Sequence, residues 1–86
     1  MSGNTRSSCN HAHVLELARA GDWETAHTTV QVHGDSLSCL IHGYLHRVEG
    51  DLGNAAYWYR RGGSALPDNT LDEEWARLYR AAGAGN

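Results

Sequence analysis

Residues 36–67, SLSCLIHGYLHRVEGDLGNAAYWYRRGGSALP, contain two helical patterns that meet at Gly50 and Asp51. Gly50 can supply the left-handed backbone that ends one helix, and the Asp51 carboxylate can accept hydrogen bonds from the free N–H groups that begin the next. On each side of this turn, apolar residues recur at spacings that place them on one helix face. They are Leu37, Leu40, Ile41, Tyr44, Leu45 and Val48 before the turn, and Leu52, Ala55, Ala56 and Tyr59 after it. The stretch therefore predicts a helical hairpin.

A similar turn occurs earlier in the chain, at Gly21 and Asp22. A helix is expected to begin at about Ser8 and to end at Gly21, and Asp22 is expected to cap a second helix. The inward face of this second helix corresponds in position to the apolar face that follows Asp51, and it consists of Trp23, Ala26, His27 and Val30. The segment therefore predicts a first hairpin before the one described above.

A fifth helix is predicted after Pro67, because Thr70 and Glu73 have the spacing of a capping box. The expected fold is all-α, with two antiparallel helix hairpins and a C-terminal capping helix. Residues 8–82 are assigned to this single domain, residues 1–7 to a disordered N-terminus and residues 83–86 to a flexible tail. The apolar stripe of the fifth helix contains Leu71, Trp75, Leu78, Tyr79 and Ala82.

Small residues and one proline in the central stretch carry a family resemblance. At successive offsets of seven, five, four, three and five residues stand Gly43, Gly50, Ala55, Tyr59, Gly62 and Pro67. This pattern resembles the tetratricopeptide repeat, a paired-helix unit in which small residues let the two helices approach closely. On the first helix, however, this chain has Cys39, His42 and His46 where that family has a large aromatic residue, a leucine and a tyrosine. The segment GDLGNAAYWYRRGG also looks like a motif of uncharacterised small bacterial proteins.

The resemblance implies a non-catalytic module that binds a protein or peptide through a helix-lined groove. Carried over position by position, the groove residues would be Leu37, Leu40, Tyr44, Arg47 and Val48. Their apolar character favours an apolar peptide, or coverage of the groove by another helix. A second possibility is self-association, since a two-repeat array leaves an open end that a homodimer would cover.

Composition narrows the class of partner. The net charge is −3 and lysine is absent, so the clustered positive charge of a nucleic-acid-binding surface is not expected. No segment has the roughly 20 apolar residues of a membrane span, and the polar start MSGNTRSS lacks the apolar run of a secretion signal. Cys9 and Cys39 have no CxxC spacing and are expected to be reduced thiols. A cytoplasmic protein is therefore expected.

The six histidines are the compositional oddity of this chain. His42 and His46 are four residues apart and share a helix face, an arrangement that can bind a metal if His27 or Glu49 supplies a third ligand. The alternative is that they pack against Tyr57, Trp58 or the first hairpin, with His27 as an interior histidine. Because the chain has no HExxH motif or paired CxxC motif, the sequence alone assigns no metal and no cofactor.

The run from Tyr57 to Arg61 offers another surface. Tyr59 is expected to point inward and Tyr57 to lie on the opposite side of the helix with Arg61. The fifth helix, through Trp75, would then cover Tyr57, unless these side chains meet a partner, since Tyr, Trp and Arg are enriched at binding hot spots. A small-molecule or metal-binding protein is thus the alternative function, with candidate residues His27, His42, His46, Tyr57, Trp58 and Arg61.

No catalytic residue is assigned from the sequence. The chain has no nucleophile elbow, phosphate loop or calcium loop. Cys39 shares a broad helix side with His42 and His46, but side chains of one regular helix rarely meet in the geometry of a nucleophile and its base. The chain is therefore expected to be no enzyme.

Overall fold

The computed structural model describes residues 9–83, and within this range all regular structure is helical. The predicted all-α class and the five helices are confirmed. The first helix begins at His11, later than expected, because the Asn10 side chain caps it by accepting from the backbone N–H of His13. The expectations for residues 1–7 and 84–86 lie outside the described residues. The helices are α1 (His11–Arg19), α2 (Trp23–Val30), α3 (Ser36–Val48), α4 (Leu52–Arg61) and α5 (Leu71–Ala81).

Each helix begins at a side chain that accepts from the first turn. The caps of α2, α3 and α4 are Asp22, Asp35 and Asp51, and Thr70 forms with Glu73 the capping box predicted for α5. The two predicted hairpin turns use glycine in the left-handed region, at Gly21 (φ +89°) and Gly50 (φ +84°). The capping side chains and turn glycines predicted for the two hairpins are therefore present in the structure.

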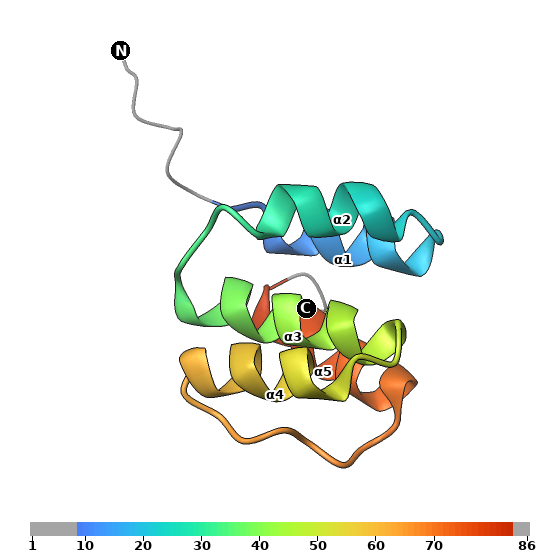
Figure 1. Ribbon diagram of the computed structural model, residues 1–86. Helices are drawn as coiled ribbons and strands as arrows, with labels where there is room; N and C mark the ends of the chain where they lie inside the picture. Colours follow the sequence, from blue (N-terminus) through green and yellow to red (C-terminus); the bar gives the residue numbers. More distant parts are fainter. Residues whose placement is uncertain (1–8, 84–86) are drawn as a thin grey trace.

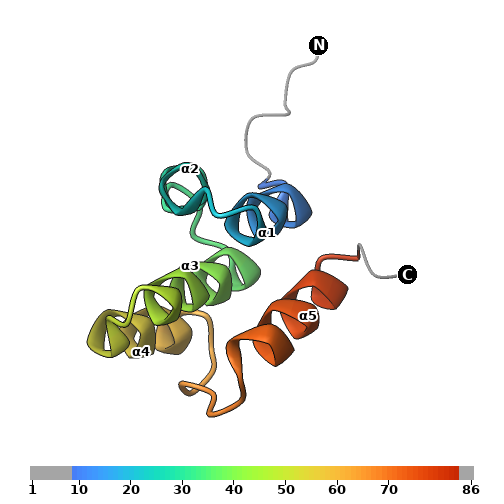
Figure 2. The same ribbon diagram turned by 90° about the vertical axis from the view of Figure 1, so that its right-hand side faces the viewer.

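The helices form two stacked hairpins and one further helix, as Figure 1 shows: α1 and α2 lie above α3 and α4. The view in Figure 2 shows that α5 lies on the other side of α3 from α4 and reaches α1. Helix α3 contacts all four others and is the centre of the fold. None of the helices in residues 9–83 is long and apolar enough to cross a membrane.

The core lies around α3. Helices α3 and α4 approach each other closely at Gly43. A β-carbon at Gly43 would lie 2.6 Å from Cδ2 of Tyr59 and 3.1 Å from the carbonyl oxygen of Ala55, so only glycine lets the Tyr59 ring pack against α3. Tyr59 is completely buried, as predicted. The other apolar core residues are Val14, Leu15, Ala26, Val30, Ile41, Tyr44, Leu45 and Leu78.

One carboxylate is buried in this core. The Glu74 side chain has no solvent exposure and accepts from the Tyr59 hydroxyl (2.7 Å), from Asn69 Nδ2 (2.9 Å) and from Arg77 Nε and Nη2 (both 2.8 Å). Arg47 donates to Asn69 in turn. These charge-assisted bonds hold the pKa of Glu74 below its ordinary value against the opposing effect of burial. The network connects α4 and the loop before α5 to α5 itself.

Two residues expected on the inward faces lie outside. Leu52 is 56% exposed and Val48 is 44% exposed, so the prediction that both pack inward is wrong. Leu52 is the first residue of α4 and Val48 the last of α3, and the helix ends extend past the core that Ala55 and Tyr59 fill. Spacing along a helix predicts a direction, but it does not predict where the neighbouring element stops.

Candidate functional site

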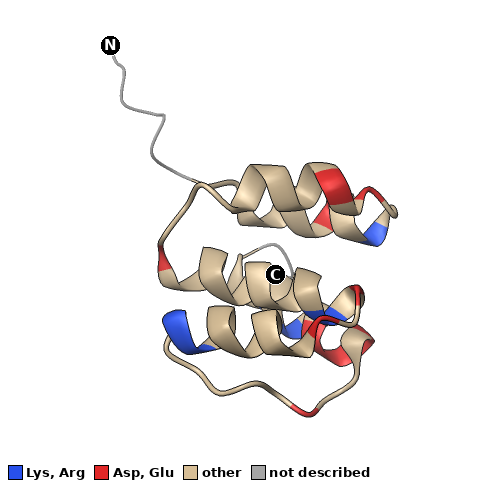
Figure 3. Ribbon diagram, in the orientation of Figure 1, with Lys and Arg blue, Asp and Glu red and all other residues tan. Residues whose placement is uncertain are grey.

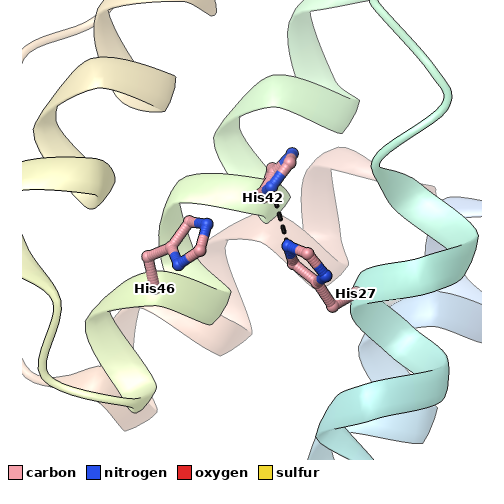
Figure 4. A group of neighbouring side chains, drawn as sticks. All are labelled: His27, His42 and His46. Carbon is pink, nitrogen blue, oxygen red and sulfur yellow. Dashed lines mark hydrogen bonds between the residues drawn. The ribbon is translucent and has the colours of Figure 1, made fainter.

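The three histidines singled out from the sequence meet between the two hairpins. His27 projects from α2, and His42 and His46 project from successive turns of α3 toward it, as Figure 4 shows. His42 and His46 are 3% and 7% exposed, and His27 is half-buried. The helical spacing put two of these rings on one face of α3, and the packing of α2 on α3 supplied the third.

The ring nitrogens lie at distances suited to a metal ion. His27 Nε2 and His42 Nε2 are 3.1 Å apart, and one nitrogen from each of the three rings lies within 4.8 Å of the others. Four-coordinate zinc with Zn–N bonds of about 2.0 Å places its donor atoms about 3.3 Å apart. The His27–His42 pair already has this spacing, and the His46 nitrogen lies within 4.8 Å of both, so a small shift of the His46 ring would bring all three to it.

A carboxylate orients the third ring. His46 Nδ1 lies 2.8 Å from Glu49 Oε2, and since a carboxylate only accepts, the proton is on Nδ1. The other nitrogen, Nε2, therefore carries the free lone pair. Histidine ligands of metals commonly donate their second N–H to a carboxylate, which holds the ring and makes the ligating nitrogen more basic.

Two tryptophans form the walls of the site. Trp23 stacks on His27 with ring centroids 4.7 Å apart, and Trp58 stacks on His42 with centroids 3.9 Å apart. Trp23 Nε1 donates to the Leu45 carbonyl oxygen (2.7 Å), which fixes that indole between α2 and α3. The rings are thus held by apolar contacts, with little freedom to turn away from one another.

This environment keeps His27 and His42 neutral. Burial, followed by the neighbouring His27, His46 and Arg61 charges, lowers the pKa of His42 to about 4, and burial also lowers the pKa of His27. At neutral pH both rings are therefore uncharged, and one of the two facing Nε2 atoms carries the proton that it donates to the other, a proton that a metal ion would displace. The uncharged ring is the form in which imidazole binds metals.

One nitrogen of His42 is left without a partner. His42 Nδ1 is buried and has no hydrogen bond to any residue in the described part of the chain. The other nitrogen of the ring faces only His27 Nε2. A buried polar atom without a partner costs about 1–3 kcal/mol of stability. Because Nε2 is the nitrogen that faces His27, it is the candidate ligand atom of His42, and the unpartnered Nδ1 lies on the other side of the ring.

The remaining aromatic and basic candidates line the outside of this cluster. Arg61 lies over the Trp58 ring, with Cζ 4.9 Å from its centroid, and also reaches Tyr57. Tyr57 is 47% exposed, so the expectation that α5 covers it is wrong. Trp75 instead stacks on Tyr79 and donates to the Leu15 carbonyl oxygen, because α5 packs mainly against α1 and α3 and meets α4 at the buried Tyr59–Glu74 hydrogen bond.

The groove positions taken from the family resemblance lie on the opposite side of α3. Leu37 and Leu40 pack against the core, and Arg47 donates to Asn69. Tyr44 and Val48 line a cavity of about 260 Å³ between α1, α3 and α5. The other residues lining this cavity are Ala18, Arg19, Leu71, Asp72 and Trp75.

A serine, histidine and aspartate also meet, unanticipated from the sequence. His11 Nε2 lies 2.9 Å from Asp35 Oδ2 and 3.1 Å from Ser38 Oγ, and the Ser38 hydroxyl donates to Asp35 Oδ1 (2.7 Å). One His11 nitrogen faces both partners, so it donates to the carboxylate and has no lone pair for the serine proton. The trio braces α1 against α3 and has no geometry for activating a nucleophile.

Charge is dispersed over the molecule. Figure 3 shows the basic segments in separate places and the acidic ones scattered over helices and loops, with no continuous basic face in this view. Cys39 is 1% exposed, and its thiol lies 3.7 Å from the Gly34 carbonyl oxygen, so it points away from His42 and His46. The histidine cluster is therefore the feature with the clearest chemistry in the described residues.

Comparisons with known proteins add no assignment. The chain matches no protein-family model, no curated protein and no solved structure. The tetratricopeptide resemblance stays a prediction that rests on the residues quoted for it, and any function has to come from the chain's own geometry.

Proposed function

We propose that this protein binds a divalent transition-metal ion through His27, His42 and His46. The observation that carries the proposal is the convergence, within 4.8 Å, of one ring nitrogen from each of three histidines on two helices, with Glu49 behind one of them. Hydrogen bonding among the rings accounts for only one of their contacts, the His27–His42 pair. A metal ion would satisfy lone pairs of all three.

The donor set favours zinc. Three imidazoles and no thiolate suit Zn²⁺, Ni²⁺, Co²⁺ and Cu²⁺ and disfavour the hard ions Mg²⁺ and Ca²⁺. Rings from two packed helices form a three-dimensional cluster suited to tetrahedral coordination. The core residues and the Glu74 network hold the fold without the ion, so the role is that of a ligand site in a helical domain.

The test is a zinc titration by calorimetry on chelator-treated protein. We expect one ion per chain, and we expect His27→Asn to weaken binding by more than the roughly 10–100-fold that loss of an outer-shell partner costs. His13 is exposed and does not belong to the group formed by His27, His42 and His46, so His13→Asn is the matched control and should bind as the parent does. Absence of stoichiometric binding, or equal loss in both variants, would reject the proposal.

A second candidate function is peptide binding in the manner of the resembled family. It is supported by the cavity of about 260 Å³, which Tyr44 and Val48 share with Trp75 and which has room for one apolar side chain. A selected apolar peptide should shift the indole NMR signal of Trp75, and Val48→Asp should remove that shift. A peptide that shifts only the Trp23 and Trp58 signals would count against this groove.

For either function we propose a cytoplasmic location, in line with the two free cysteines.

A further inference from the structure

Three ligands leave a four-coordinate ion with one position to fill, and the surroundings of the histidine cluster indicate what fills it. Among the described residues, the group that includes all three histidines contains no further histidine, cysteine or carboxylate. Glu49 groups with His46 and Asp51 only, and its carboxylate is engaged with His46 Nδ1 on the far side of that ring. The fourth position is therefore open to a ligand from outside the chain.

The charge around this position favours an anion. Three neutral imidazoles do not compensate the charge of a divalent ion, and the one carboxylate in contact with the rings lies behind His46. Arg61 lies over the Trp58 indole that stacks on His42 and adds one positive charge. Glu24 and Glu49 act on His27 with one negative charge each, so the sum with a divalent ion stays positive. The tryptophan walls lower the local polarity, which strengthens the attraction between the metal and a negative ligand.

The shape of the site limits the size of that anion. Trp23 and Trp58 stack on His27 and His42, so the indoles occupy the ring faces on both sides of the cluster. His42 and His46 are almost completely buried, whereas His27 is half-buried, so the approach from solvent is along His27. Because the two indoles pack directly on the ligand rings, the site favours a small ion of a few atoms over a bulky one.

From these three observations we infer that the metal bound by His27, His42 and His46 keeps one exchangeable position that takes a small monovalent anion. The inference rests on the proposed metal-binding function. It assigns compact anions such as hydroxide and azide as the ligand class of the site. It also describes a metal centre in which the protein leaves one ligand position unfilled. Metal-bound water at such a position would lose a proton more readily than free water does.

The experiment is an azide titration of the Co²⁺-loaded protein, followed by visible absorption. We expect a strong four-coordinate cobalt spectrum that changes saturably with one azide per metal, and Arg61→Gln should weaken azide binding several-fold while cobalt affinity stays within about twofold. Asp68→Asn, a charge change in an exposed loop, is the matched control and should leave both affinities unchanged.

The possible outcomes distinguish a failure of the open ligand position from a failure of metal binding itself. No cobalt binding at all would reject the metal site itself. Tight cobalt binding without any response to azide would keep the metal site and overturn the open position. Sedimentation that shows two chains per metal would overturn it as well, because a side chain of a second copy would then occupy the fourth position.

Discussion

Single side chains decide how well the histidine cluster can hold a metal, and Glu49 is the one whose charge can be removed without disturbing the core. It is exposed, and its Oε2 accepts from His46 Nδ1. Glu49→Gln keeps an acceptor and removes the charge, so zinc affinity should fall about tenfold. Calorimetry at 0.15 M salt measures the change, with Asp68→Asn as the control. An equal fall in the two variants would mean that net charge alone is responsible.

The protonation of His42 gives a pH dependence to the metal-free protein. The pKa of His42 is about 4 in the folded state, because of burial and then the charges of His27, His46 and Arg61. At His27 burial also lowers the pKa, and the Glu49 charge partly offsets that lowering. The unfolded chain binds a proton at about pH 6.5, so stability is complete above that pH and is lost as the pH falls toward 4. We expect a loss of about 2 kcal/mol between pH 7 and pH 5.

Thermal unfolding with a chelator present measures this loss. His42→Asn should flatten the dependence in the same pH window, although it lowers stability at all pH values. Asp35, whose pKa is lowered to about 2, loses its contribution only below its unfolded value of 3.8 and does not interfere above pH 5. A midpoint that does not change between pH 7 and pH 5 would contradict the neutral, buried state of the histidines.

Glu74 and Tyr59 form the other buried polar contact whose contribution can be measured. The Tyr59 hydroxyl donates to Glu74 Oε2 at 2.7 Å inside the core. Tyr59→Phe leaves a buried carboxylate with fewer donors and should lower the free energy of unfolding by about 1.5–3 kcal/mol. Tyr57→Phe removes a half-exposed hydroxyl of the same helix and should change it by less than about 0.5 kcal/mol. Urea unfolding compares them, and equal effects would place no special weight on Glu74.

Between elements, the contact of α3 with α4 depends on the absence of a side chain at Gly43. A methyl group there would lie 2.6 Å from the Tyr59 ring, so Gly43→Ala should destabilise the protein by about 1–3 kcal/mol despite the better helix propensity of alanine. Gly53 lies in α4 with nothing within 4 Å of a β-carbon, so Gly53→Ala should stabilise by about 0.5–1 kcal/mol. The opposite signs, read by urea unfolding, test the close approach directly.

Contacts between helices also explain the orientation of α5. Its capping box and apolar stripe were predicted from the sequence, but its partners were not. Trp75 bonds to the Leu15 carbonyl oxygen and Tyr79 to Glu16, so α5 closes against α1. Tyr57 on α4 is left open to solvent as a result. An amphipathic pattern states that a face will be covered and does not state by which element.

Across the whole molecule, a metal at the cluster would connect one hairpin to the other, because His27 belongs to the first and the two remaining ligands to the second. Binding to the folded state alone adds about 2.7 kcal/mol at a free zinc concentration of one hundred times the dissociation constant. For a domain of this size that corresponds to a rise of roughly 10–20 °C in the thermal midpoint. Calorimetric scans should show this rise in the parent and in His13→Asn, and its absence in His27→Asn. A rise that survives His27→Asn would place the ion elsewhere.

The sequence by itself determined the helices, their caps and the glycines of the two hairpin turns, because capping and helical periodicity depend on residues near one another in the chain. It also placed His42 and His46 on one face. Only the tertiary structure decided that His27 joins them, that Glu49 orients His46, and that Glu74 lies buried under Tyr59. These contacts depend on the angle at which one hairpin packs on the other, and many distant side chains set that angle together.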